Sequence, residues 1–431
     1  MNENYLELLK RTKEQLQYKG EDRYKKFKLS FNPFPKSGTA NINESDEFTK
    51  NLEPVDTDTL TKVVQYVIDS LYAPDENDQK LIATILGDYG TGKTQLLLFV
   101  KYLLQKESPT KSFVVYINNP GTKLSELIGA IIDEIGREHF KKFIWNHVIN
   151  EISLTKNNYK ELLLKFISGN TGLFGPDKSP FSDEAKSNHK TFLDTFLNNI
   201  NNRNKRKEFN IKIKDIILEI LRNKFDDDVI ADYFYNIISE DIGVSKTWET
   251  MTSGSGKYLD KKVVFLLNAI IELIRDQGFE RFYLLVDEFE DITSGRLTKK
   301  EIDNYSHNLR TLIDKQRRWC LLIAMTEQAL RELRKSSPPL VDRLTDREIR
   351  LEKLHPSSAQ KLIKNYLRLA KLTNDDSIAP FSDDVIEYLC QKSNNFPRLL
   401  LRNCFFLIER GIQDANISII DKKFAENHLD N

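Results

Sequence analysis

The chain has 431 residues, of which 40% are hydrophobic and 30% are charged, so it can bury a large core and has room for two or three domains. Lysine plus arginine and aspartate plus glutamate both number 64, which excludes a global charge excess as a reason to bind nucleic acid or membrane. No stretch approaches the roughly 18 uncharged residues of a membrane span. The isolated Cys320, Cys390 and Cys404 lack metal-binding spacing, and we interpret them as buried thiols of a cytoplasmic protein.

Along the chain, apolar strands alternate with helical segments. Residues 3–30 are charged and helix-periodic, and "FNPFPKSG" ends them with two prolines and a glycine. Strands are expected at 81–86, 112–118, 282–288, 319–326 and within 347–354, and helices at 58–72, 93–105, 124–136, 263–277 and 304–314. Strands that are apolar on both faces are typical of a parallel sheet covered by helices. The sequence therefore predicts an α/β fold.

Two regions depart from this alternation. Between about Gly136 and Lys262 the chain is rich in asparagine and lysine and mostly helical, with a loop-like stretch at 168–183, which predicts an inserted helical subdomain. After 347–354 the pattern is wholly helical, which predicts a C-terminal helical lid. The expected domains are an N-terminal helical segment (1–30), a core in two parts (31–136 and 262–354), the insertion (137–261) and the lid (355–431).

The stretch "GDYGTGKT" predicts a phosphate-binding loop between a buried strand and an apolar helix. Gly87, Gly92, Lys93 and Thr94 fill the pattern G-x-x-x-x-G-K-[ST], and Gly90 gives the backbone further freedom. Backbone amides and the helix N-terminus hold phosphate oxygens, Lys93 supplies a positive charge and Thr94 can bind Mg²⁺. The predicted ATP and Mg²⁺ site is Gly87, Asp88, Tyr89, Gly90, Thr91, Gly92, Lys93, Thr94 and Gln95. The alternative is a chance match in a glycine-rich turn.

The stretch "FYLLVDEFED" supplies the acids that a hydrolysing phosphate-binding loop requires. We expect Asp287 to bind the metal and Glu288 to activate water, with the two segments meeting across neighbouring strands. The alternative is a solvated acidic strand end, which is how we interpret Glu290 and Asp291.

Three further residues are candidates for sensing or stabilising the γ-phosphate. Thr326 ends a strand and could contact the γ-phosphate or the attacking water; alternatively it merely terminates the strand. Arg343, with Arg347 as the second choice, could reach the γ-phosphate of an adjacent subunit, or form a surface or intrachain salt bridge. Arg398 begins a lid helix and could swing onto the phosphates, or act as a capping or salt-bridging arginine.

The motifs "GDYGTGKT", "LLVDE", "LIAMTE", "PPLVDRL" and "NNFPRLLLR" stand in an order that resembles the AAA+ ATPases. The resemblance covers residues 31–136 and 262–425 and is greatest to the initiator-like branch, with the origin-recognition and ExeA-type ATPases. The segment from "LLVDEFEDI" to "SSPPLVDRL" is most similar to ATP-binding proteins of BREX-type phage-defence clusters. The ATPase of DNA phosphorothioation systems is a related possibility. Asn395 stands where the Gly-x-Pro-Arg lid signal has glycine, and "NPFP" resembles a segment that lines the adenine pocket in ExeA-like proteins.

The resemblance implies an oligomeric ATPase, assembled as a ring or filament, that acts on DNA or DNA-bound partners. The roles that it implies are phosphate and metal binding by Lys93 and Thr94, metal binding by Asp287, general base for Glu288, first sensor for Thr326, intersubunit arginine finger for Arg343 and second sensor for Arg398. Because the sequence stops at Asn431, we expect no winged-helix domain after the lid.

A basic cluster in the insertion is the candidate nucleic-acid contact. Arg203, Lys205, Arg206 and Lys207, followed by Lys212 and Lys214, would suit salt-dependent binding of double-stranded DNA without sequence preference. The alternative is a solvated helix face. A second cluster, 315–318, is expected at a subunit interface or on the solvent side of a helix.

The preferred hypothesis is a Mg-ATP hydrolase of the AAA+ type that serves as an oligomeric motor or switch in an anti-phage defence or DNA-processing system, with other proteins of that system as partners. The alternative is a nucleotide-dependent scaffold or regulatory switch with little DNA contact. A signal-transducing ATPase that regulates an effector is the third hypothesis.

Overall fold

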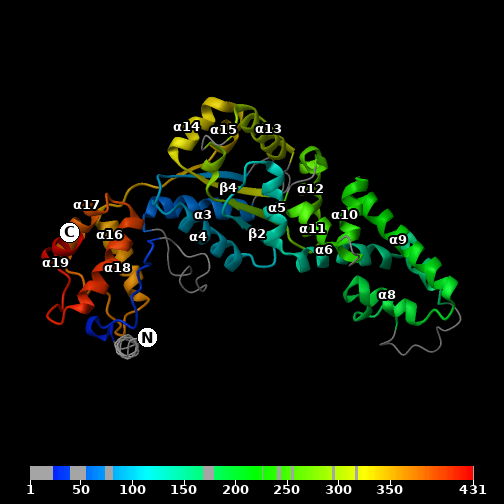
Figure 1. The fold of residues 1–431 in the computed structure, drawn as a ribbon, viewed down its shortest axis with the longest axis horizontal. Coiled ribbons are helices and arrows are strands. Elements are labelled where there is room, and N and C mark those ends of the chain that lie inside the picture. The colour runs from blue at the N-terminus through cyan, green and yellow to red at the C-terminus, as the bar shows by residue number, and fades with distance from the viewer. Residues whose placement is uncertain are drawn as a thin grey trace, which may run out of the picture.

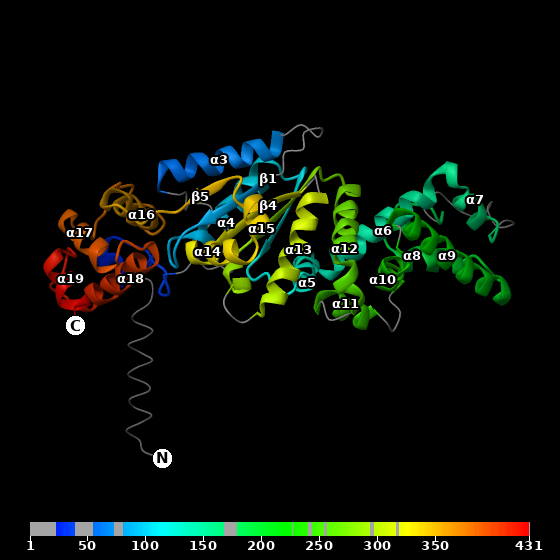
Figure 2. The same cartoon turned by 90° about the horizontal axis from the view of Figure 1, so that it is seen from above.

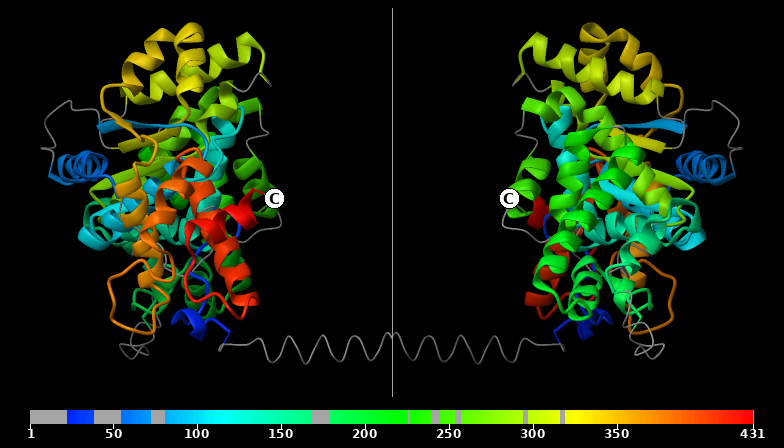
Figure 3. Two further views of the ribbon diagram at one scale, coloured as in Figure 1. Left: turned by 90° about the vertical axis from the view of Figure 1, so that its left-hand side faces the viewer. Right: turned by 90° about the vertical axis from the view of Figure 1, so that its right-hand side faces the viewer.

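The computed structural model describes residues 23–38, 55–72, 81–167, 179–225, 227–239, 244–253, 257–293, 297–315 and 319–430. Most of the predicted N-terminal helical segment, part of the loop-like stretch at 168–183 and residues 316–318 of the second basic cluster lie outside these ranges. The described chain is elongated, with a sheet at its centre, a helical bundle at one end and the inserted helices at the other (Figure 1). Figure 3 shows these two ends in turn.

The centre is a five-stranded parallel sheet, which confirms the predicted α/β fold. Its strands are β1 (Leu81–Leu86), β2 (Ser112–Ile117), β3 (Arg281–Val286), β4 (Trp319–Met325) and β5 (Glu348–Arg350). They are ordered β2-β3-β4-β1-β5, and every pair is parallel. Leu86 pairs with Met325, and Val286 pairs with Ile323. The segments that follow β1, β3 and β4 therefore meet at one edge of the sheet.

The strand order corrects one expectation. The glycine loop follows β1 and the acid pair follows β3, but β4 lies between these strands, so the two segments do not come from neighbours. The order of parallel strands depends on where each crossover helix packs, which apolar runs in the sequence do not reveal. Thr326, directly after β4, consequently lies between the two segments.

Helices cover both faces of the sheet. All residues of β1, β3 and β4 are therefore buried. Leu81, Ala83 and Ile85 share a hydrophobic cluster with α3 (Thr57–Tyr72) and α4 (Lys93–Glu107). Ile82 and Leu86 share another with the helices of the opposite face. Those helices are α5 (Leu124–Ile135), α12 (Lys257–Asp276), α13 (Lys299–Lys315), α14 (Glu327–Ser336) and α15 (Pro338–Leu344). Figure 2 shows α3 on one side of the sheet and α5, α12 and α13 on the other.

The inserted helices extend the second face away from the sheet. They are α6 (Arg137–Ser153), α7 (Tyr159–Leu164), α8 (His189–Asn198), α9 (Arg203–Phe225), α10 (Asp228–Ser239) and α11 (Val244–Ser253). Their buried side chains belong to the same hydrophobic cluster as the sheet residues Ile82 and Leu86, so the core runs without a break from sheet to insertion. No helix in the described part of the chain combines the length and apolarity needed to cross a bilayer.

A separate core fills the C-terminal helical bundle, which consists of α16 (Pro356–Arg368), α17 (Asp383–Lys392), α18 (Pro397–Gln413) and α19 (Lys422–Leu429). The N-terminal segment, residues 23–38, packs into this bundle. Phe34 is 2% exposed and stacks on Tyr366 with ring centroids 5.7 Å apart. The resemblance had implied that the "NPFP" motif lines a base pocket. Phe34 instead belongs to the bundle core, because its ring packs best among other apolar side chains.

Candidate functional site

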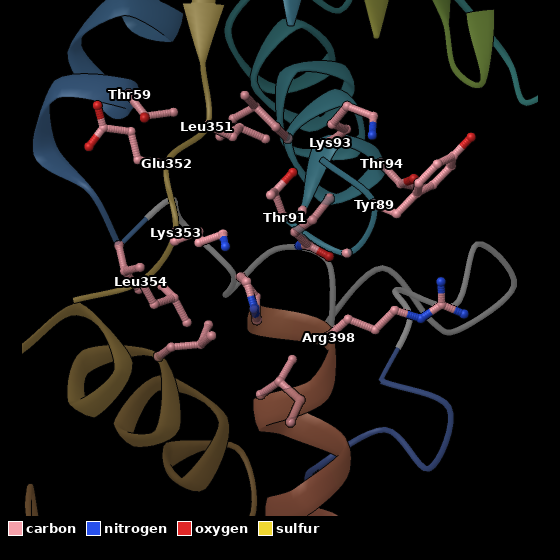
Figure 4. Close-up of a pocket in the computed structure, with 18 of the residues that line it drawn as sticks. Thr59, Tyr89, Thr91, Lys93, Thr94, Leu351, Glu352, Lys353, Leu354 and Arg398 are labelled. Atoms are coloured by element: carbon pink, nitrogen blue, oxygen red, sulfur yellow. The ribbon is translucent and has the colours of Figure 1, made fainter. Parts of the chain in front are cut away.

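A cavity of about 380 Å³ opens at the edge of the sheet, between the sheet and the C-terminal bundle. One end, which we call the apolar end, holds the apolar side chains of the lining, although Thr59, Glu352 and Lys353 lie beside them (Figure 4). These apolar side chains are Val55, Leu351, Leu354, Leu362, Tyr366 and Leu401. The other end is polar and is lined by the glycine loop, Asp287, Glu288 and Glu290. Figure 4 shows Leu351 and Leu354 on one side of the cavity and Tyr89 on the other. The cavity thus suits a ligand that has an apolar part and a polar part.

The glycine loop adopts a backbone that depends on its glycines. Gly90 and Gly92 have φ angles of +82° and +104°, in the left-handed region that side chains disfavour. Gly92 directly precedes α4, so the helix N-terminus, with its unpaired amides, faces the cavity region. Of the predicted loop residues, Tyr89 through Gln95 line the cavity, whereas Gly87 and Asp88 contribute their carbonyl groups to the contact described next.

The ammonium group of Lys93 lies folded against its own loop. Its Nζ donates to the carbonyl oxygens of Gly87 (3.0 Å) and Asp88 (3.3 Å). The side chain is only 8% exposed, so its charge is little weakened by water. An anionic group that enters the loop would find this charge already in place.

The two predicted metal ligands are in contact. Thr94 Oγ1 donates to Asp287 Oδ2 over 2.5 Å, and Asp287 is 2% exposed. No cluster of three or more His, Cys, Asp or Glu side chains suited to a metal occurs among the described residues. A magnesium ion would therefore be held by one hydroxyl and one carboxylate, with its remaining ligands from water and the bound substrate, which is the arrangement Mg²⁺ prefers.

Sequence reasoning missed Tyr116, which supports this pair. Its hydroxyl group, on β2, donates to the same Asp287 oxygen over 3.1 Å. Burial, followed by the charge of Asp287, raises the pKa of Tyr116 above its ordinary value, so the phenol remains a donor. The sequence does show a tyrosine, with its polar hydroxyl group, near the end of an apolar strand. It does not show that this strand pairs with β3.

Glu288 follows Asp287 on an exposed turn that lines the cavity. Its φ angle is +50°, an uncommon conformation for glutamate, and its backbone N–H donates to Asp287 Oδ1 over 2.9 Å. Partial burial, followed by the charges of Asp287 and Asp291, raises the pKa of the Glu288 carboxyl, and Lys93 opposes this rise. A carboxylate with a raised pKa is a stronger proton acceptor, as a general base requires.

The interpretation of Glu290 as part of a solvated strand end is wrong. A short 3-10 helix (Phe289–Thr293) follows the strand and turns Glu290 inward, where it is 8% exposed. Its Oε1 lies 3.9 Å from Lys93 Nζ, and its Oε2 has no hydrogen-bond partner among the described residues. Burial raises the pKa of the Glu290 carboxyl. Asp291, by contrast, is partly exposed and accepts a hydrogen bond from Asn119 Nδ2 over 2.7 Å.

Thr326 caps a helix at a second, adjoining cavity. Its Oγ1 accepts a hydrogen bond from the backbone N–H of Ala329 over 3.1 Å, which stabilises the start of α14. Thr326 thus ends strand β4, as the alternative expected, and it also caps helix α14. Thr326 also lines the second cavity of about 830 Å³, as do Glu290 and Arg398.

Arg398 joins the bundle to the glycine loop. Its backbone N–H donates to the carbonyl of Gly90 over 3.2 Å, and it lines both cavities. Its exposed side chain extends beneath the loop on the side of Tyr89 (Figure 4), and no described residue forms an ion pair with it. Among the described residues, Arg398 therefore has no salt bridge of the kind that the alternative predicts.

Asn395 stands where the Gly-x-Pro-Arg lid signal has glycine, and its backbone adopts a positive φ angle that glycine would also allow. Its φ angle is +63°, in the left-handed region that asparagine tolerates better than most residues. Its carbonyl accepts a hydrogen bond from the backbone N–H of Leu354 over 2.9 Å, beside the cavity. The chain therefore makes the turn that places Arg398 without a glycine.

The two arginines before β5 form intrachain salt bridges. Arg343 donates to both carboxylate oxygens of Asp314, from Nε over 2.8 Å and from Nη2 over 3.1 Å. Arg347 Nη1 donates to Asp69 over 2.6 Å. Neither arginine lines the cavity. In the single chain these arginines thus adopt the salt-bridge alternative, and a finger role for Arg343 requires it to leave Asp314.

The predicted nucleic-acid residues lie at the far end of the molecule. Arg203, Lys205, Arg206 and Lys207 are exposed at the start of α9, and Arg206 Nε donates to the carbonyl of Ile200 over 2.6 Å. Lys214 lies over the ring of Tyr235. Figures 1 and 2 show α9 at the end opposite the C-terminal bundle. The structure thus keeps the basic cluster accessible and separates it from the cavity.

Neither a protein-family model nor a curated protein matches the sequence.

Proposed function

We propose that the protein is a Mg-ATP-binding and hydrolysing ATPase of the AAA+ type. The observation that carries the proposal is the contact of Thr94 with Asp287 beside the buried ammonium of Lys93. These residues come from two segments that are separated by the whole insertion, yet they converge on one cavity at the edge of a parallel sheet. Ligands of open parallel sheets bind at this edge.

Each part of the cavity has a role in the proposed reaction. The loop amides and Lys93 hold the phosphates, and Thr94 and Asp287 hold the magnesium ion. Bound Mg²⁺ neutralises charge on the phosphate oxygens. Glu288 accepts the proton of the attacking water. The apolar end, with Leu354 and Tyr366, takes the nucleoside base.

Two features of the described residues support a function that involves phosphate groups and DNA. Arg398 extends beside the loop without an ion-pair partner among the described residues, so it is available to contact phosphates. The cations at the start of α9 oppose the helix dipole, which disfavours positive charge at that end, and an anionic partner would relieve this conflict. Together with the resemblance to the AAA+ ATPases, these features lead us to propose a homo-oligomeric motor or switch in DNA processing or anti-phage defence.

The ion pair of Arg343 with Asp314 favours the second candidate, a nucleotide-dependent scaffold. While this pair persists, no finger is available to an adjacent subunit. ATP would then be bound and turned over slowly, and the bound state itself would organise partner proteins.

Calorimetric titration with Mg-ATP, followed by phosphate release with and without duplex DNA, tests the proposal. We expect binding in the micromolar range or tighter, weak turnover by the dilute protein, and faster turnover at higher protein concentration or with DNA. Saturable binding with a single turnover and no stimulation would favour the scaffold. The absence of any Mg-ATP binding would overturn both functions.

The basic cluster makes its own prediction. Replacing Arg203, Lys205, Arg206 and Lys207 with alanine is expected to weaken duplex DNA binding and to lower the dependence of log K on log salt by about 3.6, because each of the four lost phosphate contacts removes about 0.9 of a released counterion. Fluorescence anisotropy with a labelled duplex at several salt concentrations measures both. A matched control replaces four exposed bundle lysines, Lys361, Lys392, Lys422 and Lys423. Equal losses in the two variants would exclude a specific role for α9.

A further inference from the structure

Negative charge exceeds positive charge at the polar end of the cavity. The carboxylates of Asp287, Glu288 and Glu290 line this end, against the cations of Lys93 and Arg398. Arg398 is exposed to solvent, whereas Lys93 is buried. Lys93 is thus the one of these two cations whose charge acts at nearly full strength, because solvent screens exposed charges.

Glu290 differs from the other two carboxylates in its surroundings. Asp287 accepts hydrogen bonds from Thr94 and Tyr116, and Glu288 is exposed to water. Glu290 is 8% exposed, and its Oε2 is without a hydrogen-bond partner in the described part of the chain. Its Oε1 is within ion-pair distance of Lys93 Nζ, at 3.9 Å, but too far for a hydrogen bond. Its charge is therefore little hydrated, and Lys93 offsets it only across 3.9 Å, without a hydrogen bond.

Glu290 also lies where the two cavities adjoin, since it lines both of them. A polyphosphate that contacts Lys93 must come within a few ångströms of this buried carboxylate. Repulsion at that distance in a poorly hydrated site opposes binding of an uncomplexed polyphosphate. A divalent cation between Thr94, Asp287 and the phosphates would offset the repulsion.

We propose that Glu290 is a specificity-determining residue that makes the site select metal-chelated nucleoside polyphosphates and reject metal-free ones. This inference rests on the proposed function, and it concerns the charge state of the ligand rather than the catalysis. Glu290 does not bind the metal in this account. Its negative charge makes the binding free energy less favourable for phosphate groups whose charge no metal ion has neutralised.

Replacing Glu290 with glutamine, which keeps the size of the side chain and removes its charge, tests the proposal by calorimetric titration. The probes are ATP in excess EDTA and ATP in excess Mg²⁺. The Glu290→Gln variant is expected to bind metal-free ATP about tenfold more tightly than the wild type, and to bind Mg-ATP within about threefold of the wild type. Glu290→Met, which also lacks the charge, should shift metal-free binding in the same direction.

Asp291→Asn is the matched control, because Asp291 carries the same charge one residue later but is partly exposed and hydrogen-bonded by Asn119. It should change neither affinity. The inference is overturned if both Glu290 variants bind metal-free ATP no more tightly than the wild type, or if Asp291→Asn has the same effect. In those cases Mg-ATP binding by the wild type leaves the proposed function standing. Failure of the wild type to bind Mg-ATP would overturn the inference and the proposed function together.

Discussion

Replacing Lys93 with alanine is expected to weaken Mg-ATP binding about a hundredfold, which corresponds to about 2.7 kcal/mol. The substitution removes the ammonium that donates to the Gly87 and Asp88 carbonyl groups. It also removes the cation that lies 3.9 Å from the buried carboxylate of Glu290. Charge-assisted hydrogen bonds to phosphate oxygens contribute roughly 1.5–3 kcal/mol each. Calorimetric titration with Mg-ATP measures the loss.

Lys101→Ala is the control for this variant. Lys101 lies on the same helix, α4, but its Nζ pairs with Glu134 at 3.6 Å and it does not line the cavity. Thermal unfolding of both variants shows whether either has lost its fold. Affinity within about threefold of the wild type in a folded Lys93→Ala protein would contradict the proposed site. Combining Lys93→Ala with Glu290→Gln should restore part of the affinity, because the buried carboxylate and the missing ammonium act on the same phosphates.

Replacing Glu288 with glutamine is expected to lower the rate of phosphate release by a factor of about 100 to 1,000, while Mg-ATP binding stays within about threefold of the wild type. General base catalysis contributes rate factors of this size, and glutamine cannot accept the proton of the attacking water. Glutamine has nearly the same shape, so the turn at φ +50° and the hydrogen bond from its backbone to Asp287 are expected to persist. Single-turnover phosphate release after mixing with Mg-ATP isolates the chemical step.

Asp291→Asn again supplies the matched control for this experiment, since it removes one carboxylate from the same acidic run outside the main cavity. Because Asp291 contributes less than burial and Asp287 to the raised pKa of Glu288, the rate of phosphate release of Asp291→Asn should fall far less than that of Glu288→Gln, and stay within about threefold of the wild type. If Glu288→Gln kept the wild-type rate, the base would have to be another group, and Glu290 would be the next candidate because its carboxylate also lines the cavity and is not a predicted metal ligand.

The strands of the sheet could be predicted because each is a short run of apolar residues, and the buried faces of β1, β3 and β4 match that pattern. The order of the strands could not be predicted from the same pattern. An apolar run indicates that a strand is buried, but it does not indicate which strand lies beside it. The position of β4 between β1 and β3 depends on the packing of the crossover helices, which joins residues far apart in the sequence.

The candidate site could be predicted where a local motif specifies chemistry. The glycine loop and Asp287 converge as expected, since each directly follows a strand of the same parallel sheet. Tyr116 and Glu290 were missed for different reasons. Tyr116 reaches Asp287 from another strand, and Glu290 is buried only because the chain forms a 3-10 turn after β3. Both contacts are tertiary, and neither residue type marks such a contact in the sequence.

The N-terminal segment is attached to the C-terminal bundle and not to the sheet. Residues 23–38 pack into the C-terminal bundle, through Phe34 and the ion pair of Arg23 with Glu409. At the end of this segment, Gly38 lies so close to Arg398 that an added Cβ would be 2.1 Å from its carbonyl oxygen. A probe or protein fused ahead of residue 23 is thus anchored to the bundle rather than to the sheet. A label placed there would therefore follow the orientation of the bundle, which borders the glycine loop through Arg398.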